Sequence, residues 1–149
     1  MLDVPDIEIR RGRPDDAPAI VALIDRENHR PADVDEIGGY LASFPSVVAT
    51  VADEVVGFIY SRRFSPDILE WRNSLVASTM RRVGLGRRLV EAMEAETRAA
   101  GYSAAIGVNC WKHPGATRER AAAARAFWLA MDWAILFATD GSAVIAKHL

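Results

Sequence analysis

A strand, a helix and a second strand follow one another in the middle of this chain of 149 residues. Residues 67–79 carry a β-strand pattern, and residues 85–100 carry apolar side chains at helical spacing until Gly101 ends the helix. Residues 102–109 then form the next predicted strand. Strands joined through a helix usually lie parallel in one sheet. The order therefore predicts at least one parallel strand pair at the centre of the fold.

The other predicted elements surround this central unit. Before it we expect a strand, two helices and a β-hairpin, at residues 7–12, 14–28, 31–44 and 46–64. After it we expect a loop, a helix and a closing hairpin, at residues 110–117, 118–132 and 133–149. Because hairpins join antiparallel strands, the expected fold is α/β (α+β). We expect a single domain, 1–149, with a mixed, mostly antiparallel sheet of about six to seven strands and helices on both faces.

The side-chain pattern also predicts faces and pairs within the elements. Leu69, Trp71 and Leu75 have the same parity along their strand, which places them on one face of a regular strand. On the helix over 85–100, Glu94 and Arg98 have the i,i+4 spacing of an ion pair.

Composition narrows the class of protein. The chain has 18 basic and 20 acidic residues, and a net charge of −2 does not favour general nucleic-acid binding. No apolar run reaches the roughly 18 residues of a transmembrane helix, and the N-terminal segment lacks a signal-peptide pattern. We therefore expect a cytoplasmic protein without a nucleic-acid or membrane partner. The single cysteine, Cys110, and the scattered histidines predict no metal site.

The segment Arg81-Arg82-Val83-Gly84-Leu85-Gly86 joins the central strand to the central helix. The first N–H groups of a helix are unpaired, and the helix dipole attracts anions there. Glycines let a ligand approach the backbone, and Arg87 and Arg88 add further positive charge. The segment predicts a phosphate or pyrophosphate site, with close packing of helix against sheet as the alternative. It lacks the complete glycine fingerprints of P-loop and Rossmann nucleotide sites, which disfavours an ATP- or NAD-binding domain.

The same segment resembles the Arg/Gln-x-x-Gly-x-Gly/Ala motif of the GCN5-related N-acetyltransferase (GNAT) family. Further segments are similar to patterns of that family: VVGFIYSRRF (55–64), SLVAST (74–79), ARAFWLAMDW (124–133) and the closing VIAKHL. The resemblance implies the family's fold, in which the central parallel strands splay apart. It also implies acetyl transfer from acetyl-CoA to a primary amine of a small molecule or peptide. A non-catalytic acyl-CoA-binding or sensor domain of the same fold is the alternative.

The resemblance implies a set of cofactor contacts. The pantetheine arm would lie along Leu75, Val76 and Ala77, and Trp128 would pack beside the cofactor. The pyrophosphate would lie on the loop formed by Arg81, Arg82, Val83, Gly84, Leu85, Gly86 and Arg87. Arg82, Arg87 and Arg88 are the candidates to reach the adenosine 3′-phosphate. No metal is implied.

The resemblance also places Glu70, six residues before Val76, at the position of a general base in histone-acetylating members. The alternative for Glu70 is a strand glutamate paired with Arg62 or Arg63 on the neighbouring strand. Many family members place the base elsewhere or use a chain of waters.

Three positions depart from the family pattern. Trp128 replaces a tyrosine that often serves as general acid, and an indole N–H cannot supply a proton at useful pH. Ala121 stands in place of an asparagine, and Asp132 in place of a glycine. These changes favour the non-catalytic alternative, whereas Glu70 and the intact loop favour an enzyme.

The residues constrain the identity of the acetyl acceptor least. Acidic residues gather between positions 25 and 36, namely Asp25, Glu27, Asp33, Asp35 and Glu36, and would attract a cationic amine or form a solvated face. Cys110 is a candidate nucleophile, although a lone cysteine is more often a small buried hydrophobe. We expect His113 on the loop surface, and a homodimer that covers the edge of the hairpin at 133–149.

Overall fold

The computed structural model describes residues 6–149. Its strands form one sheet in the order β1-β2-β3-β4-β5-β7-β6. Their bounds are β1 (Ile7–Arg11), β2 (Ser46–Val51), β3 (Glu54–Arg63), β4 (Ile68–Val76), β5 (Ala104–Cys110), β6 (Ala134–Ala138) and β7 (Ser142–His148). Only β4 and β5 run parallel among the strand pairs in these residues. The predicted mixed sheet is therefore confirmed.

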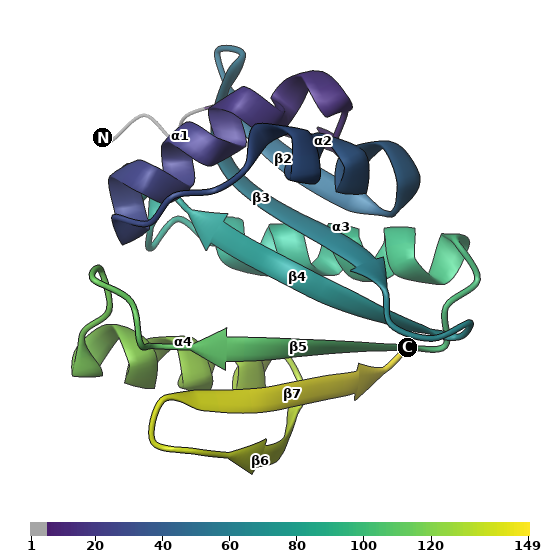
Figure 1. Cartoon of the computed structure of the whole chain (residues 1–149), viewed down its shortest axis with the longest axis vertical. Coiled ribbons are helices and arrows are strands. Elements are labelled where there is room, and N and C mark those ends of the chain that lie inside the picture. The colour runs from purple at the N-terminus through teal and green to yellow at the C-terminus, as the bar shows by residue number, and fades with distance from the viewer. Residues whose placement is uncertain (1–5) are drawn as a thin grey trace.

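The helices lie on both faces of this sheet, as predicted (Figure 1). Their bounds are α1 (Ala17–Asn28), α2 (Val34–Ser43), α3 (Leu85–Ala99) and α4 (Arg118–Ala130), with short 3₁₀ turns η1 (Pro14–Asp16) and η2 (Ser78–Met80). In Figure 1, α1 and α2 lie in front of the half of the sheet that contains β2 to β4. Helices α3 and α4 lie behind the sheet.

Helix α3 packs tightly against the sheet because the apolar side chains along one of its faces are buried. Leu85, Leu89 and Met93 are each at most 1% exposed. At Gly57 of β3, a Cβ atom would lie 2.9 Å from Leu89 Cδ1, so a larger residue there would force the Leu89 side chain to shift. Burial of side chains of this size is worth roughly 1.5–3 kcal/mol each. This packing fixes the start of α3 next to the end of β4.

A β-bulge interrupts β4 where it pairs with β3. Tyr60 pairs with Asn73, whereas the next residue of β3, Ser61, pairs with Trp71. Arg72 is therefore the extra residue on β4. A bulge of this kind bends a strand and re-aims its side chains.

The bulge separates two residues that were expected on one face. Trp71 Nε1 donates to Thr97 Oγ1 of α3 at 3.2 Å, which places Trp71 on the α3 face. Leu75 pairs with Phe58, whose ring stacks on Tyr60, and Tyr60 stacks on a tyrosine of α2. Leu75 therefore shares the α2 face, and the prediction that it lies with Trp71 is wrong. The cause is the one extra residue in β4, which inverts the alternation.

The predicted ion pair between Glu94 and Arg98 is also wrong. Glu94 is only 5% exposed, and its Oε1 lies 2.5 Å from Nζ of Lys147 on β7. Lys147 also donates to the carbonyl of Met131 at 2.9 Å. Because a buried carboxylate needs a charged partner, the lysine across the sheet satisfies Glu94 better than a solvated arginine.

Candidate active site

The central parallel strands pair over only part of their length. Residues Ile68 to Trp71 of β4 pair with Ala104 to Gly107 of β5, and no pair follows. Beyond this point, residues 72–76 and 108–110 face each other across a gap (Figure 1). A cleft of about 1150 Å³ occupies the gap and is lined by both strand ends. The backbone groups on these inner edges are available to an extended ligand.

Aromatic side chains close the cleft where the strands part. The ring of Trp133 lies 4.7 Å from that of Trp71 and 5.0 Å from that of Trp128 on α4. All three residues line the cleft. Phe127 packs against Trp128 at 5.3 Å. Packed aromatic rings therefore line the cleft where the two strands part.

The predicted anion-binding loop also lines the cleft, and its Gly86 lies next to Phe127. Arg82 and Gly84 have left-handed backbones, with φ of 68° and 77°. Within residues 6–149, no backbone carbonyl accepts from the N–H groups of Leu85, Gly86 and Arg87; the first bond of the helix is Arg88 N to Gly84 O, at 3.2 Å. Unpaired N–H groups at the positive end of a helix dipole are suited to hold an anion.

Most of the predicted cofactor contacts line this cleft. They are Leu75, Val76, Arg81, Arg82, Gly84, Leu85, Gly86, Arg87 and Trp128. Ala77, Val83 and Glu70 are not among the lining residues. Ala77 instead donates its N–H to Val56 O of β3 at 2.8 Å, which anchors the end of β4.

The arginines of the loop point in different directions. Arg81 Nη2 lies 3.5 Å from Val76 O and 3.6 Å from Glu27 Oε2, so this side chain braces the loop. Arg88 Nη2 lies 3.5 Å from Ile7 O of β1, and Arg88 does not line the cleft. Arg82 and Arg87 do line it and are the better placed candidates for the 3′-phosphate.

Glu27 is a residue of this site whose contacts the sequence did not predict. Its Oε1 accepts from the N–H of Ser78 at 2.9 Å and from the Ser78 hydroxyl at 3.1 Å. Burial by itself would raise the pKa of Glu27, but these hydrogen bonds and the charge of Arg81 outweigh it, and the pKa is lowered. Glu27 and Ser78 lie 51 positions apart, so no local pattern signals their contact.

Glu70 takes the alternative partner expected for it. Its Oε2 accepts from Arg62 Nε on β3, and its Oε1 lies 3.8 Å from Arg72 Nη1. The Glu70 side chain is 14% exposed. The role of general base therefore stays a prediction, with the added condition that Arg72, the looser partner, must release Oε1.

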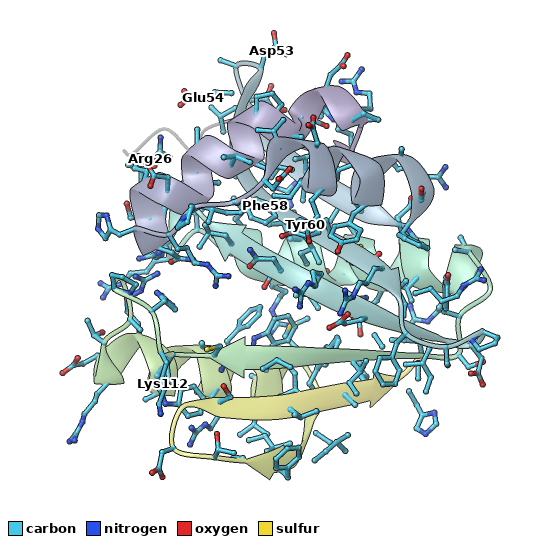
Figure 2. The ribbon with its side chains drawn as sticks, in the orientation of Figure 1. Arg26, Asp53, Glu54, Phe58, Tyr60 and Lys112 are labelled. Carbon is cyan, nitrogen blue, oxygen red and sulfur yellow. The ribbon has the colours of Figure 1, made fainter. Side chains whose placement is uncertain are left out.

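A polar group lies on the α2 side of the cleft. Tyr60, Arg72, Asn73 and Arg30 all line it there, and Tyr60 is 6% exposed. Burial raises the pKa of Tyr60, against the opposing effects of Asn73 and of the positive charges of Arg72 and Arg30. Figure 2 shows Tyr60 beside Phe58, under the helices that cover this half of the sheet.

The loop between β5 and α4 reaches across to the end of α1. A Cβ atom at Gly115 would lie 2.8 Å from Glu27 O and 2.9 Å from Asn28 Cα, so the contact requires glycine. Arg120 donates to the carbonyl of Gly115 and lies 3.5 Å from Asn28 Oδ1. The loop between β5 and α4 therefore packs against the C-terminal end of α1.

His113 lies in this loop, as expected, and its partly exposed side chain lines the cleft. Its Nδ1 is buried without a hydrogen-bond partner in the described part of the chain. Burial, and then the charges of Arg120 and Arg30, lower the pKa of His113. Cys110 is exposed and also lines the cleft.

The acidic residues between positions 25 and 36 do not act as one rim. Glu27 holds Ser78, and Asp33 caps α2 by accepting from Glu36 N at 2.9 Å. Glu36 accepts from the hydroxyl of Tyr40, also at 2.9 Å. Asp33 and Glu36 line the cleft, whereas Asp25 and Asp35 do not.

Neither a metal site nor a membrane segment is found in residues 6–149. No three His, Cys, Asp or Glu side chains gather there in a metal-binding arrangement. Nor is any helix in that range both long and apolar enough to cross a bilayer.

Comparison with known proteins gives a family match over most of the chain. Residues 15–132 match the model of the acetyltransferase (GNAT) family. Among curated proteins, no sequence matches.

Solved structures share the fold at low sequence identity. Ard1 from Thermoplasma volcanium has a TM-score of 0.79 at 19% identity, over 96% of this chain and 97% of that one. The ribosomal-protein-S18-alanine N-acetyltransferase from Escherichia coli has a TM-score of 0.77 at 18% identity, over 96% and 94%. YncA of Salmonella typhimurium, a putative acetyltransferase solved with acetyl-CoA, has a TM-score of 0.75 at 15% identity, over 97% and 94%.

Proposed function

Because the chain belongs to the acetyltransferase (GNAT) family, we propose that it transfers an acetyl group from acetyl-CoA directly to a primary amine. The observation that carries the proposal is the fork between β4 and β5, with a helix start of unpaired N–H groups beside it. An extended thiol arm and a pyrophosphate are the two parts of acetyl-CoA that such a site would hold.

The residues present fit this cosubstrate. The unpaired inner edge of β4 at Leu75 and Val76 suits the amide groups of the pantetheine arm. The N–H groups at the start of α3 and the guanidinium groups of Arg82 and Arg87 suit the phosphates. Acetyl-CoA, when bound, supplies the acetyl group as a reactive thioester. The aromatic end of the cleft, with Trp128, excludes water from the reacting end.

The amine has to lose its proton before it can attack, since a free alkylammonium has a pKa near about 10. Glu70 is the proton acceptor that we propose, acting through water because it does not line the cleft. Its place one residue before the fork, at the pair between Glu70 and Ile106, supports this role.

Trp128 gives the leaving thiolate no proton, because an indole N–H is not an acid at neutral pH. A thiolate is a tolerable leaving group, so we propose that it departs unprotonated or takes a proton from water. Trp128 then acts only through packing. The non-catalytic acyl-CoA-binding alternative differs in one respect, the absence of turnover.

The experiment follows thiol release from acetyl-CoA over a panel of primary amines, with mass spectrometry of the N-acetyl products. We expect release that depends on the amine and equals the product formed. Cys110→Ala is the matched control, because direct transfer leaves its rate within about threefold of the wild type. A hundredfold loss in that variant would indicate an acetyl-cysteine route. Binding without release by any amine would support the sensor alternative.

We also propose that the chain forms a homodimer through its terminal hairpin. β6 is an edge strand, and Leu136 and Phe137 on it are each 60% exposed. An uncovered apolar edge favours association with a second strand. Light scattering of the purified protein tests this, and a monomeric mass at micromolar concentration would contradict it.

A further inference from the structure

We propose that the acceptor carries a carboxylate near its amine, and that Arg72 and Arg30 bind this carboxylate. The inference rests on the proposed acetyl transfer and adds the class of substrate. The two arginines line the α2 side of the cleft together with Tyr60 and Asn73.

The β-bulge accounts for the position of Arg72. As the extra residue between the pairs at Trp71 and Asn73, Arg72 has no partner residue on β3. Its side chain is 43% exposed and has one loose ionic contact, at 3.8 Å, with Glu70. The tighter partner of Glu70 is Arg62. Arg72 therefore keeps most of its donors for another acceptor.

Arg30, which follows α1, supplies the second positive charge. It makes no ion pair with any residue in the range 6–149 that the structure describes. It lines the same cleft, and its charge acts on the Tyr60 hydroxyl together with that of Arg72. Arg30 and Arg72 are thus two cationic side chains in the lining of the same cleft.

Within residues 6–149, the neighbouring acids Asp33 and Glu36 make no ion pair with either arginine. Glu36 accepts from the hydroxyl of Tyr40, and Asp33 caps α2. Glu70 is shared between Arg62 and Arg72. The guanidinium donors of Arg30 and most of those of Arg72 are therefore available to an anionic group on the acceptor.

Neutral donors complete a site for a carboxylate. Burial raises the pKa of Tyr60, so its hydroxyl stays protonated and can donate. Asn73, which pairs with Tyr60 across the strands, carries an amide that donates as well. A guanidinium binds a carboxylate through two parallel hydrogen bonds, which also fixes its orientation. The acetyl-CoA phosphates are expected at the loop that follows β4, whereas Arg72 lies within that strand.

The experiment compares acids with their amides. Glycine, leucine, phenylalanine and glutamate are assayed beside glycinamide and the matching α-amides, at saturating acetyl-CoA. We expect kcat/KM at least tenfold higher for the best acid than for its amide. Arg72→Gln and Arg30→Gln should each reduce this ratio at least fivefold, mainly through KM. Arg98→Gln, at an exposed residue of α3 that does not line the cleft, should keep the ratio. An amide as good as its acid, or an equal loss of the ratio in Arg98→Gln, would overturn the inference.

A binding measurement separates this inference from the proposed function. N-acetylleucine and N-acetylleucinamide are titrated calorimetrically into the protein saturated with CoA. Tighter binding of the acid, lost in Arg72→Gln, supports the carboxylate site even without turnover. Equal binding of both, or of neither, overturns it. Failure of the protein to bind CoA at all would instead contradict the proposed function.

Discussion

The carboxylate of Glu27, at the end of α1, accepts hydrogen bonds from both the backbone N–H and the hydroxyl of Ser78. Ser78 begins the turn that leads into the anion-binding loop. The Glu27 side chain is only 9% exposed, and its second oxygen lies 3.6 Å from Arg81. Helix α1 thus holds the loop at which we expect the cosubstrate to bind.

Replacement of Glu27 by alanine is expected to raise the Kd for acetyl-CoA about tenfold. Hydrogen bonds to a charged group contribute about 1.5–3 kcal/mol, and tenfold in affinity is about 1.4 kcal/mol. Calorimetric titration measures the change. Asp25→Ala is the control, because Asp25 is exposed on the same helix and does not line the cleft. Affinity within twofold of wild type in Glu27→Ala would show that the contact does not position the loop.

Replacement of Glu70 by glutamine is expected to lower turnover by roughly 10²-fold, with little change in acetyl-CoA affinity. The amide cannot accept the proton but keeps the size of the side chain. Measurement of kcat against pH adds a second readout, because loss of a general base also changes the profile. Unchanged turnover would leave Glu70 only as the partner of Arg62 and Arg72.

Phenylalanine at position 128 is expected to leave kcat within about threefold of the wild type, because an indole N–H supplies no proton. The ring of Trp128 contacts those of Trp133 and Phe127, so Trp128→Ala should instead lose about 2–5 kcal/mol of unfolding free energy. Steady-state kinetics and urea unfolding measure the two effects. A hundredfold fall of kcat in the folded Trp128→Phe protein would give the indole a direct chemical role.

Acid should destabilise the protein through Asp16. Burial would raise the pKa of Asp16, but hydrogen bonds from Arg10, at 2.8 Å, and from Arg13 N, at 2.7 Å, lower it below the ordinary 3.8. A lowered pKa means that the unfolded chain takes up the proton first as the pH falls. The stabilisation is therefore complete above the ordinary value and is lost below it.

The matching variant, Asp16→Asn, should lower the unfolding free energy by about 1–3 kcal/mol at pH 7. The difference from wild type should shrink as the pH falls below the ordinary carboxyl value. Urea unfolding at several pH values provides the measurement, and Asp15→Asn, at an exposed neighbour, is the control. A difference that stays constant with pH would assign the loss to packing and not to charge.

The elements, and the place of the loop between β4 and α3, could be predicted from the sequence because their signals are local. Helical spacing, turn residues and the glycines at 84 and 86 lie within a few positions of what they determine. The same local signals place Leu85, Leu89 and Met93 in the core.

Long-range contacts and the bulge could not be predicted in this way. One extra residue, Arg72, moves Leu75 to the other face of β4, and nothing in the residue types marks it. Glu94 looked like a surface partner of Arg98, yet it finds Lys147 on a strand far along the chain. The contacts of Glu27 with Ser78 and of Gly115 with the end of α1 likewise join residues that are far apart in the sequence.

Calorimetric titration with acetyl-CoA, with ATP and NAD as controls, tests the central claim most directly. The fork between β4 and β5 and the unpaired N–H groups of α3 predict binding of acetyl-CoA alone. Gly84→Glu should weaken it strongly, because position 84 has a φ of 77° and the new carboxylate repels the phosphates. Absence of acetyl-CoA binding, or equal binding by Gly84→Glu, would contradict the assignment of the cleft and its loop.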